Sequence, residues 1–248
     1  MKIAILCGFS LDAFQQKVLQ PIVEDPTIEI VGALLDCRPR PSLKKRFLKN
    51  LKRGRGGYMI IMLFKCYFAK KRPSVTTAEF FTAHSIPCIE TREPYTEETA
   101  ERLRDLHPEA MVMIGGFGIV KEPLLSLAPK GILSYHHGNM RKYRGQPVGF
   151  WELYHNETEM GVTVQRLSAG IDKGTPIVEK TIHIERKDNV ATLRDRALDS
   201  STGMMHEALR LIRQSDFKPT AIDHYGPIFT IPNLRQYLTL QIKLLFRK

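Results

Sequence analysis

Short apolar segments alternate with amphipathic segments along most of the chain. The apolar runs are near-continuous, which is typical of strands that a parallel sheet buries on both faces. The segments between them repeat apolar residues at helical spacing. Strands are expected at residues 2–7, 28–35, 86–89, 110–114, 132–136, 161–165 and 181–184, and helices at residues 11–23, 76–84, 96–106 and 192–212. The last of these is expected to be one long amphipathic helix.

This alternation, at intervals of roughly 20 to 30 residues, predicts an α/β fold with a Rossmann-like, mostly parallel sheet and helices on both faces. Ligands of such sheets bind beyond the carboxyl ends of the strands, where the turn at residues 115–118 and the side chain of His136 are expected to lie. We expect residues 1–212 to form this domain, with an insertion at about 38–72. Residues 213–248 are expected to form a C-terminal extension that ends in a basic amphipathic helix.

Length and composition are those of an ordinary globular protein. The chain has 248 residues, of which 43% are hydrophobic and 25% are charged, and this balance excludes wholesale disorder. No apolar run reaches the ~18 residues that a membrane-spanning helix needs, and the N-terminal run is too short for a signal peptide. The cysteines at 7, 37, 66 and 88 have no CxxC spacing. We therefore expect a cytoplasmic chain without a disulfide framework or a zinc site.

Positive charge is concentrated in one segment. The formal net charge is +11, yet residues 38–72 hold thirteen basic side chains and no acidic one, and the remainder is close to neutral. Such a segment attracts nucleic acid, an anionic membrane or a phosphorylated ligand; a solvated insertion is the alternative. Its apolar run at residues 58–64, together with the apolar residues of 238–248, suits helices that lie on a membrane surface.

The densest cluster of polar residues spans positions 134–145, where an apolar run ends. It contains His136, and Asp172 follows in a glycine-flanked loop. A His at a strand end and an Asp in a loop can act as general acid and base if the fold brings them together. Two such residues also occur in purely structural roles, so their spacing leaves both interpretations open. His137 is not expected to share a metal ion with His136, since neighbours on a strand point to opposite faces.

Four motifs follow one another between residues 108 and 184. They are Gly115-Gly116-Phe117, the segment from Ser134 to Gly145, Gly161-Val162-Thr163, and Ile171-Asp172-Lys173-Gly174. Their order and spacing resemble the catalytic core of the 10-formyltetrahydrofolate-dependent formyltransferases, which include glycinamide ribonucleotide, methionyl-tRNA and amino-sugar formyltransferases. The corresponding family motifs are Ala/Gly-Gly-Phe/Tyr, Asn-x-His-x-Ser-Leu-Leu-Pro-x-Tyr-Arg-Gly, Gly-Val-Thr and Leu-Asp-x-Gly. The resemblance implies the formyltransferase fold.

The resemblance also implies roles for individual residues. His136 takes the place of the catalytic His and Asp172 that of the catalytic Asp, and Ser134 stands where the family has Asn. A hydroxyl has a shorter reach than an amide and lacks its second donor, so weak transfer, a rearranged site and lost catalysis are all open. The implied folate pocket contains Gly115, Gly116, Phe117, Gly118, Ser168 and Gly170, and the implied acceptor site contains Arg141, Tyr143, Arg144 and Gly145. Arg141 either faces a phosphate or points into solvent.

The implied function is transfer of a formyl group from 10-formyltetrahydrofolate to a primary amine of a phosphorylated or nucleotide-linked acceptor, such as an amino-sugar nucleotide. No metal is implied. The alternatives are a catalytically degenerate folate- or nucleotide-binding protein and a glycinamide ribonucleotide-type formyltransferase. Further candidate partners are a second copy of the chain and an anionic membrane, met at its inner face through residues 38–72 and 238–248. Nucleic acid is not an expected partner.

Overall fold

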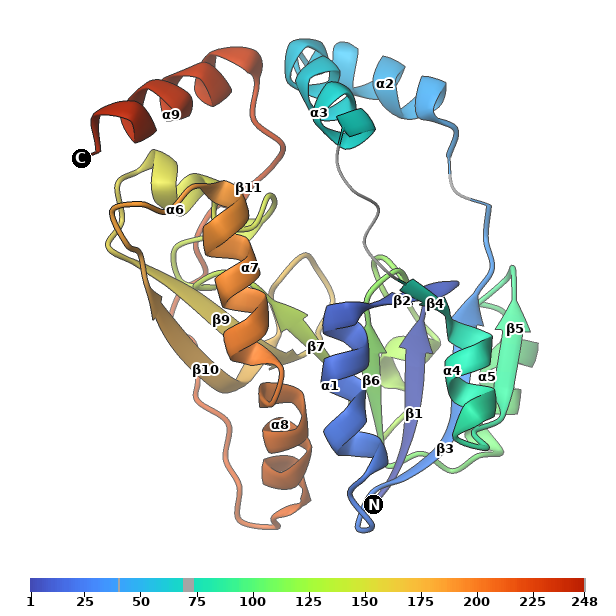
Figure 1. The fold of residues 1–248 in the computed structure, drawn as a ribbon. Helices are drawn as coiled ribbons and strands as arrows, with labels where there is room; N and C mark the ends of the chain where they lie inside the picture. Colours follow the sequence, from blue (N-terminus) through green and yellow to red (C-terminus); the bar gives the residue numbers. More distant parts are fainter. Residues whose placement is uncertain (40, 69–73, 248) are drawn as a thin grey trace.

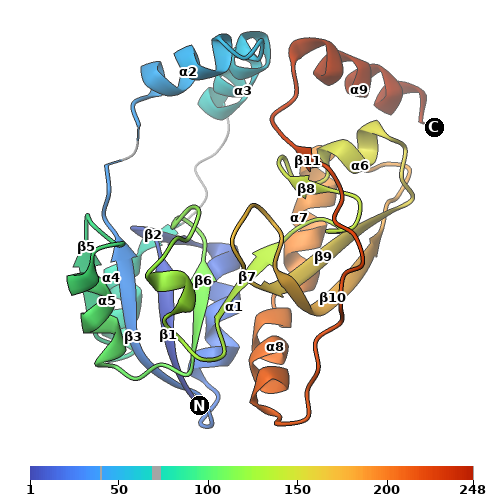
Figure 2. The same ribbon diagram turned by 180° about the vertical axis from the view of Figure 1, so that it is seen from behind.

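Among the residues that the computed structural model describes, 1–39, 41–68 and 74–247, a seven-stranded sheet forms the centre of the molecule (Figures 1 and 2). The strand order is β10-β9-β7-β6-β1-β3-β5; β9 pairs antiparallel with both β7 and β10, and all other neighbouring strands are parallel. The predicted α/β class with a mostly parallel sheet is confirmed. The strands are β1 (Lys2–Cys7), β3 (Glu29–Asp36), β5 (Cys88–Thr91), β6 (Ala110–Ile114), β7 (Ile132–His136), β9 (Glu159–Arg166) and β10 (Thr175–His183).

Helices cover both faces of the sheet because the strand side chains alternate between two apolar layers. Ile3 and Ile5 belong to one layer, while Ala4 and Leu6 belong to the other. The first layer is completed by α1 (Ala13–Val23), α4 (Thr77–Ala83), α6 (Phe150–Tyr154), α7 (Val190–Ser201) and α8 (Met204–Arg213), and the second by α5 (Glu97–Arg104) and the 3-10 helix η1 (Leu124–Ser126). Capping boxes formed by Asp12 and Thr76 begin α1 and α4.

The single long helix predicted at residues 192–212 is wrong, because two helices occupy this region. α7 ends at Ser201 and α8 begins at Met204. The hydroxyls of Ser200, Ser201 and Thr202 each donate to a carbonyl three residues earlier, just before Gly203. Such bonds bend helices, and glycine has a low helix propensity. The Ser-Ser-Thr-Gly run therefore ends α7, and α8 follows as a separate helix (Figure 1).

Three helices stand apart from the sheet at one end of the molecule in both views: α2 (Leu43–Leu51), α3 (Gly56–Phe68) and α9 (Leu234–Phe246) (Figures 1 and 2). The rings of Tyr58 on α3 and Tyr237 on α9 are buried and lie 5.5 Å apart. The basic insertion and the C-terminal extension therefore pack against each other. Some basic residues of these two segments lie outside the described residues, namely Arg40, Lys70, Lys71, Arg72 and Lys248.

The C-terminal extension also returns to the polar cluster that follows β7. Its strand β11 (Ile228–Phe229) pairs with β8 (Arg144–Gly145) in a two-stranded sheet, and β2 (Ser10–Asp12) pairs with β4 (Ser74–Thr76) in another. The extension thus helps to build the region where the sequence places its candidate chemistry. None of the helices in the described part of the chain is both long and apolar enough to cross a membrane.

Candidate active site

The carboxyl ends of β1 and β6 mark the point where the strand order of the sheet reverses. The chain proceeds from β1 to β3 and β5 on one side, and from β6 to β7 on the other. Such a switch point leaves a crevice for ligands. The backbones of Gly8 and Gly116 meet here, since a Cβ on Gly116 would lie 2.9 Å from the Cα of Gly8. Gly116 also has a φ of +74°, so only glycine lets the loop at 115–118 lie against the end of β1.

A cavity of about 900 Å³ lies at this crevice. Its walls come from α2 and the turn after it, the loop after β6, the end of β7, the β9–β10 hairpin and the extension around β11. Ligand sites in proteins have volumes of ~300–1,000 Å³. The size and position of this cavity make it the candidate active site.

His136 stands at the end of β7 with its ring held in one orientation. Its Nε2 lies 2.8 Å from the carbonyl oxygen of Tyr143, and because a carbonyl only accepts, Nε2 carries a proton. Gly138 leaves room for this bond, since a Cβ there would lie 2.7 Å from Nε2. The other ring nitrogen, Nδ1, lies 3.4 Å from Oδ2 of Asp172.

Asp172 is presented by the hairpin between β9 and β10. Its φ of +45° is unusual for a residue with a side chain, and its Oδ2 accepts a hydrogen bond of 2.8 Å from the N–H of Gly145. Arg144 holds the same hairpin by donating to the carbonyl of Ile171 at 3.2 Å, and it also donates to the carbonyl of Gly226 at 2.6 Å. β8, the hairpin and the C-terminal extension are thus tied together around His136 and Asp172.

Each member of the pair favours the charged form of the other. Burial works to lower the pKa of His136, but the hydrogen bond and charge of Asp172 outweigh it, so the pKa is raised. Burial also works to raise the pKa of Asp172, but His136, the N–H of Gly145 and the amide of Gln165 lower it overall. The arrangement can therefore hold a proton on Nδ1 and a negative charge beside it, both facing the cavity.

Most of the predicted site residues line this one cavity. They are Gly115, Gly116, Phe117, Gly118, Ser134, His136, Gly145, Ser168, Gly170 and Asp172. Three predicted acceptor residues are not among its lining. Arg141 pairs with Glu179 at 2.6 Å, the hydroxyl of Tyr143 bonds to His155 and Glu157, and Arg144 forms the structural contacts described above.

Four basic side chains also line the cavity, although the sequence does not single them out individually. Arg46 and Lys49 lie on α2, and Arg53 and Arg55 lie in the turn that follows it. None of the four has a carboxylate partner within the described part of the chain. Positions 46 and 49 are three residues apart, which places them on one face of α2. The many other basic residues of this segment obscure this signal.

Two buried polar side chains beside the pair are likewise missing from the sequence-based candidates. Gln165 on β9 lines the cavity and is almost fully buried. Glu152 on α6 is buried behind His136 and lines a second, much smaller cavity with it. Burial raises the pKa of Glu152 to about 7. A long polar side chain at the end of the strand expected at 161–165 is the signal that could have identified Gln165.

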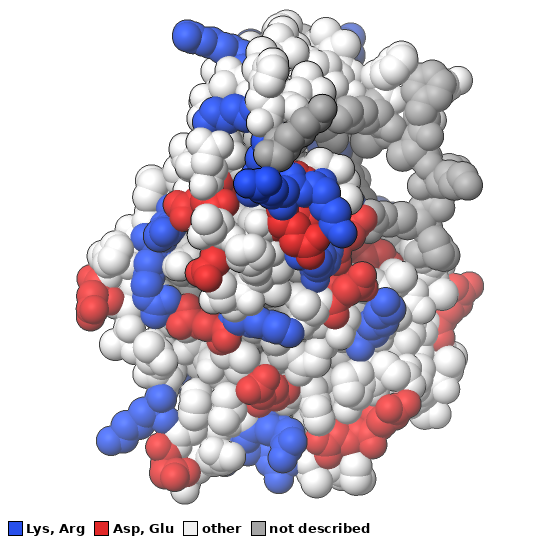
Figure 3. All heavy atoms as spheres, turned by 60° about the vertical axis from the view of Figure 1, so that its left-hand side comes forward, with Lys and Arg blue, Asp and Glu red and all other residues white. Residues whose placement is uncertain are grey.

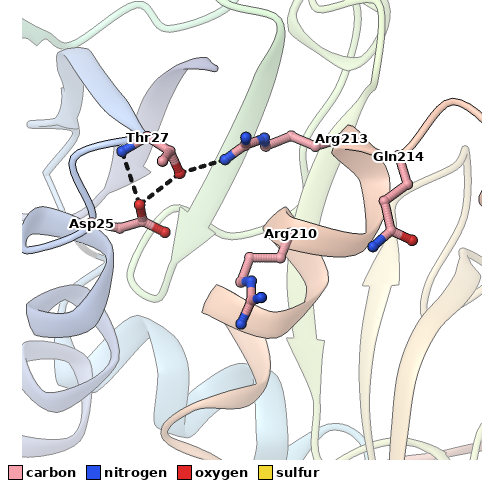
Figure 4. Close-up of a pocket in the computed structure, with 5 residues that line it drawn as sticks. All are labelled: Asp25, Thr27, Arg210, Arg213 and Gln214. Atoms are coloured by element: carbon pink, nitrogen blue, oxygen red, sulfur yellow. Dashed lines mark hydrogen bonds between the residues drawn. The ribbon is translucent and has the colours of Figure 1, made fainter.

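A separate cavity of about 500 Å³ lies at the opposite edge of the sheet, between the loop that precedes β3 and the end of α8 (Figure 4). Arg213 reaches across it to Thr27, and Thr27 bonds to Asp25. Asp25 also pairs with His206 at 2.7 Å. These contacts join α8 to the β3 side of the sheet, and the cavity contains none of the predicted site residues. Within the described residues, no group of three His, Cys, Asp or Glu side chains could hold a metal ion.

Comparison with known proteins gives two kinds of match. A family model described as formyl transferase matches residues 65–209. The methionyl-tRNA formyltransferase of Pelobacter propionicus is 27% identical over 154 residues, which is 60% of this chain and 48% of that protein. The chain spans about half the length of the curated relatives it matches.

Two solved structures share the fold over most of the chain. Glycinamide ribonucleotide transformylase 1 from Symbiobacterium toebii has a TM-score of 0.60 and 18% identity, with 90% of this chain and 94% of that chain covered. An N-formyltransferase from Helicobacter canadensis, in complex with folinic acid and dTDP-3-aminofucose, has a TM-score of 0.64 and 14% identity, with 98% and 80% covered. At these identities the likeness shows the fold alone.

Proposed function

The chain belongs to the formyl transferase family, and we propose that it transfers a formyl group from 10-formyltetrahydrofolate to a primary amine of a phosphorylated or nucleotide-linked acceptor. The observation that supports this most is the 3.4 Å approach of His136 to Asp172 inside the cavity at the switch point of the sheet. Formyl transfer needs a donor for the oxygen that gains negative charge and a group that accepts the proton of the amine. The pair supplies both.

The roles follow from the atoms that face the cavity. The amine nitrogen forms a bond to the formyl carbon, and the bond from that carbon to the folate nitrogen breaks. His136 donates from Nδ1 to the formyl oxygen as it becomes negative, since its Nε2 is engaged by Tyr143. Asp172 keeps the ring protonated and relays the proton that the amine loses to the folate nitrogen that is released, so that no net proton is gained or lost.

The four cations of the cavity wall support an anionic acceptor. Arg46, Lys49, Arg53 and Arg55 line the same cavity as the pair, and Asp172 is the one carboxylate among its described lining residues. An array of guanidinium and ammonium groups in a hollow attracts phosphate by its summed field and by charge-assisted hydrogen bonds. A phosphorylated or nucleotide-linked amine meets this requirement, and an amino-sugar nucleotide is our preferred acceptor.

Release of tetrahydrofolate tests the proposal when the protein is mixed with 10-formyltetrahydrofolate and one amine at a time. The panel contains an amino-sugar nucleotide, the same amino sugar without phosphate, glycinamide ribonucleotide and methionyl-tRNA. We expect release with a phosphorylated acceptor and its loss in His136→Ala. Folate binding without release on any of these amines contradicts transfer and favours the degenerate binding protein.

A charge-matched pair of variants tests the role of the cavity cations. R46Q/K49Q/R53Q removes three cations from the cavity wall, and K44Q/K45Q/K52Q removes three from the same segment that do not line it. The first variant is expected to raise the KM for a phosphorylated acceptor at least ~10-fold, and the second to leave it unchanged. Equal effects of the two variants contradict a direct contact with the acceptor.

A second function, attachment to an anionic membrane, is favoured by apolar stripes at the end of the molecule formed by α2, α3 and α9. Most of the large apolar side chains that are exposed in the described part of the chain lie on these helices. On α9 they are Leu234, Leu238, Ile242, Leu245 and Phe246, and on α3 they are Ile60, Leu63, Phe64 and Tyr67. Both series follow helical spacing. Phe246 is 83% exposed and Leu245 is 70% exposed, so each helix has an outward apolar face.

The charge around these stripes favours an anionic lipid surface as the occupant. The sequence has no acidic residue between positions 37 and 78 or between positions 224 and 248. On the face shown in Figure 3, acidic and basic side chains mix over the body of the molecule, whereas the upper end shows basic and uncharged ones. An apolar face flanked by basic residues binds at the headgroup boundary of anionic bilayers.

Vesicle co-sedimentation tests the attachment. We expect binding to phosphatidylglycerol-containing vesicles that weakens with salt and is lost in L238Q/I242Q/L245Q, with no binding to pure phosphatidylcholine. Binding to RNA in place of vesicles, or a concentration-dependent dimer that the triple variant dissociates, contradicts the lipid surface and identifies a different occupant.

A further inference from the structure

Ser134 and Gln165 face each other across the antiparallel strands β7 and β9. They are direct partners in the register of these strands, and opposite residues of such a pair project to the same side of a sheet. Only 3% of Ser134 and 1% of Gln165 is exposed, and both line the cavity that holds His136 and Asp172. An amide on β9 therefore stands opposite the position on β7 where the family has one.

The contacts of Gln165 fix which end of its amide faces the cavity. The backbone N–H of Gly174 donates to Oε1 of Gln165 at 2.9 Å. Because a backbone N–H can only donate, the bonded atom is the oxygen, and the NH₂ group is turned the other way. Gly174 permits this contact, since a Cβ there would lie 2.5 Å from Oε1.

With its oxygen bound to Gly174, the NH₂ group of Gln165 is the part of the amide left to interact with Asp172, and both side chains line the same cavity. This interaction helps to keep the pKa of Asp172 low. An amide NH₂ has two hydrogens, so one bond to Asp172 leaves the second hydrogen for another acceptor in the cavity.

Ser134 cannot supply the same group. Its hydroxyl lies 3.4 Å from the carbonyl of Tyr135, a long contact along its own strand. It has one hydrogen on a side chain one atom shorter than that of asparagine. The cavity thus contains a positioned NH₂ group, and it comes from β9.

We propose that Gln165 replaces the asparagine that this chain lacks at position 134, with one N–H holding Asp172 and the other donating to the formyl oxygen during transfer. This inference rests on the proposed function. It makes Gln165 a catalytic residue of that site, and it explains how the family's chemistry is compatible with Ser134.

Moving the amide from one strand to the other tests the inference. Gln165→Met keeps the length of the side chain but removes the amide. We expect its kcat to fall by about 10²-fold or more, as when one oxyanion donor is lost, while the KM for folate and acceptor changes less than ~3-fold because ground-state binding is retained. Adding S134N to give S134N/Q165M is expected to recover at least ~10-fold in kcat, because the amide returns from β7.

Two kinetic results overturn the inference. One is a Gln165→Met protein with the kcat of the wild type. The other is a loss of kcat that Ser134→Asn does not recover, which assigns Gln165 to packing. If the wild type itself shows no transfer, the proposed function fails, and NMR titration of the Asp172 carboxyl still tests the contact. Gln165→Met must raise the pKa of Asp172, and an unchanged pKa overturns the inference independently of turnover.

Discussion

Oδ2 of Asp172 lies 3.4 Å from Nδ1 of His136, while the opposite nitrogen of the same ring is bound to the carbonyl of Tyr143. The imidazole is thus fixed from both sides, with the backbone carbonyl holding a proton on Nε2 and the carboxylate favouring a second proton on Nδ1. The chain brings the two residues together by folding the β9–β10 hairpin over the end of β7.

Asp172→Asn is expected to lower the pKa of His136 relative to the wild type. Burial then acts on the ring without the opposing carboxylate. We also expect transfer to fall by about 10²–10⁴-fold, since proton transfer loses its acceptor. NMR titration of the His136 ring and tetrahydrofolate release measure the two effects.

Glu179→Gln is the matched control for that substitution. It removes a carboxylate from β10 that pairs with Arg141 outside the cavity. Both the pKa of His136 and the rate of transfer should remain at wild-type values. A rate that falls with Glu179→Gln as much as with Asp172→Asn would show that Arg141 and Glu179 belong to the working site.

Gly138→Ala is expected to lower transfer by about 10²-fold or more, because displacement of a catalytic group by ~1 Å has that effect. Its Cβ would lie 2.7 Å from Nε2 of His136 and 2.9 Å from the carbonyl of Tyr143. Gly203→Ala is the control, since a Cβ at 203 has no neighbour within 4 Å. The control should keep full activity and a melting temperature at or above that of the wild type. Full activity in Gly138→Ala would mean that the Tyr143 bond is dispensable.

Ser134→Asn alone should maintain or raise the rate of transfer. Ser134 lines a cavity of about 900 Å³, which has room for the longer side chain, and the new amide adds a donor beside that of Gln165. Single-turnover rates of the wild type and the variant compare the chemical step directly. A collapse of the rate would show that the site is organised around the hydroxyl.

Glu152→Gln should stabilise the protein at high pH and have no effect at low pH. Burial raises the pKa of Glu152 from 4.5 to about 7, so the folded state retains a proton that the unfolded state loses between these values. Stability conferred by that proton is lost as pH rises through this range. The variant should gain on the order of 2–3 kcal/mol in free energy of unfolding at about pH 8, and nothing near pH 4.

Glu157→Gln should have the opposite sign in the same denaturation series. Burial works to raise the pKa of Glu157, but hydrogen bonds from Lys142 and Tyr143 lower it overall. Its ionised form is therefore favoured in the folded state, and this stabilisation is present above the unfolded pKa and lost as pH falls.

A Glu152→Gln protein that is less stable than the wild type at high pH would contradict the assigned buried, protonated state of Glu152.

The sheet and much of the site could be predicted because apolar runs and glycine turns are local signals. The runs predicted at 110–114 and 132–136 are β6 and β7 with the same bounds, and all six residues of the predicted folate pocket line one cavity. The run Ser200-Ser201-Thr202-Gly203 indicates a helix break, but the helical spacing of apolar residues on both sides of it favours one continuous helix.

Other features depend on contacts between distant segments, which spacing alone does not specify. Gln165 lies opposite Ser134 because of the register between β7 and β9, which is a contact between distant segments. Arg141 was predicted to lie near the acceptor, but it forms an ion pair with Glu179 on β10. The direction in which Arg46 and Lys49 face the cavity was set by how α2 lies over the sheet.

A crystal structure of the protein with folinic acid and a phosphorylated amine acceptor tests the proposed site most directly. We expect the reduced pterin in the cavity beside residues 115–118, the reacting groups within ~3–3.5 Å of one another, and Nδ1 of His136 and the amide of Gln165 directed at the formyl-bearing end. Phosphate oxygens should contact Arg46, Lys49, Arg53 or Arg55. A pterin bound outside this cavity, or one with its formyl-bearing end away from His136 and Asp172, would contradict formyl transfer at this site.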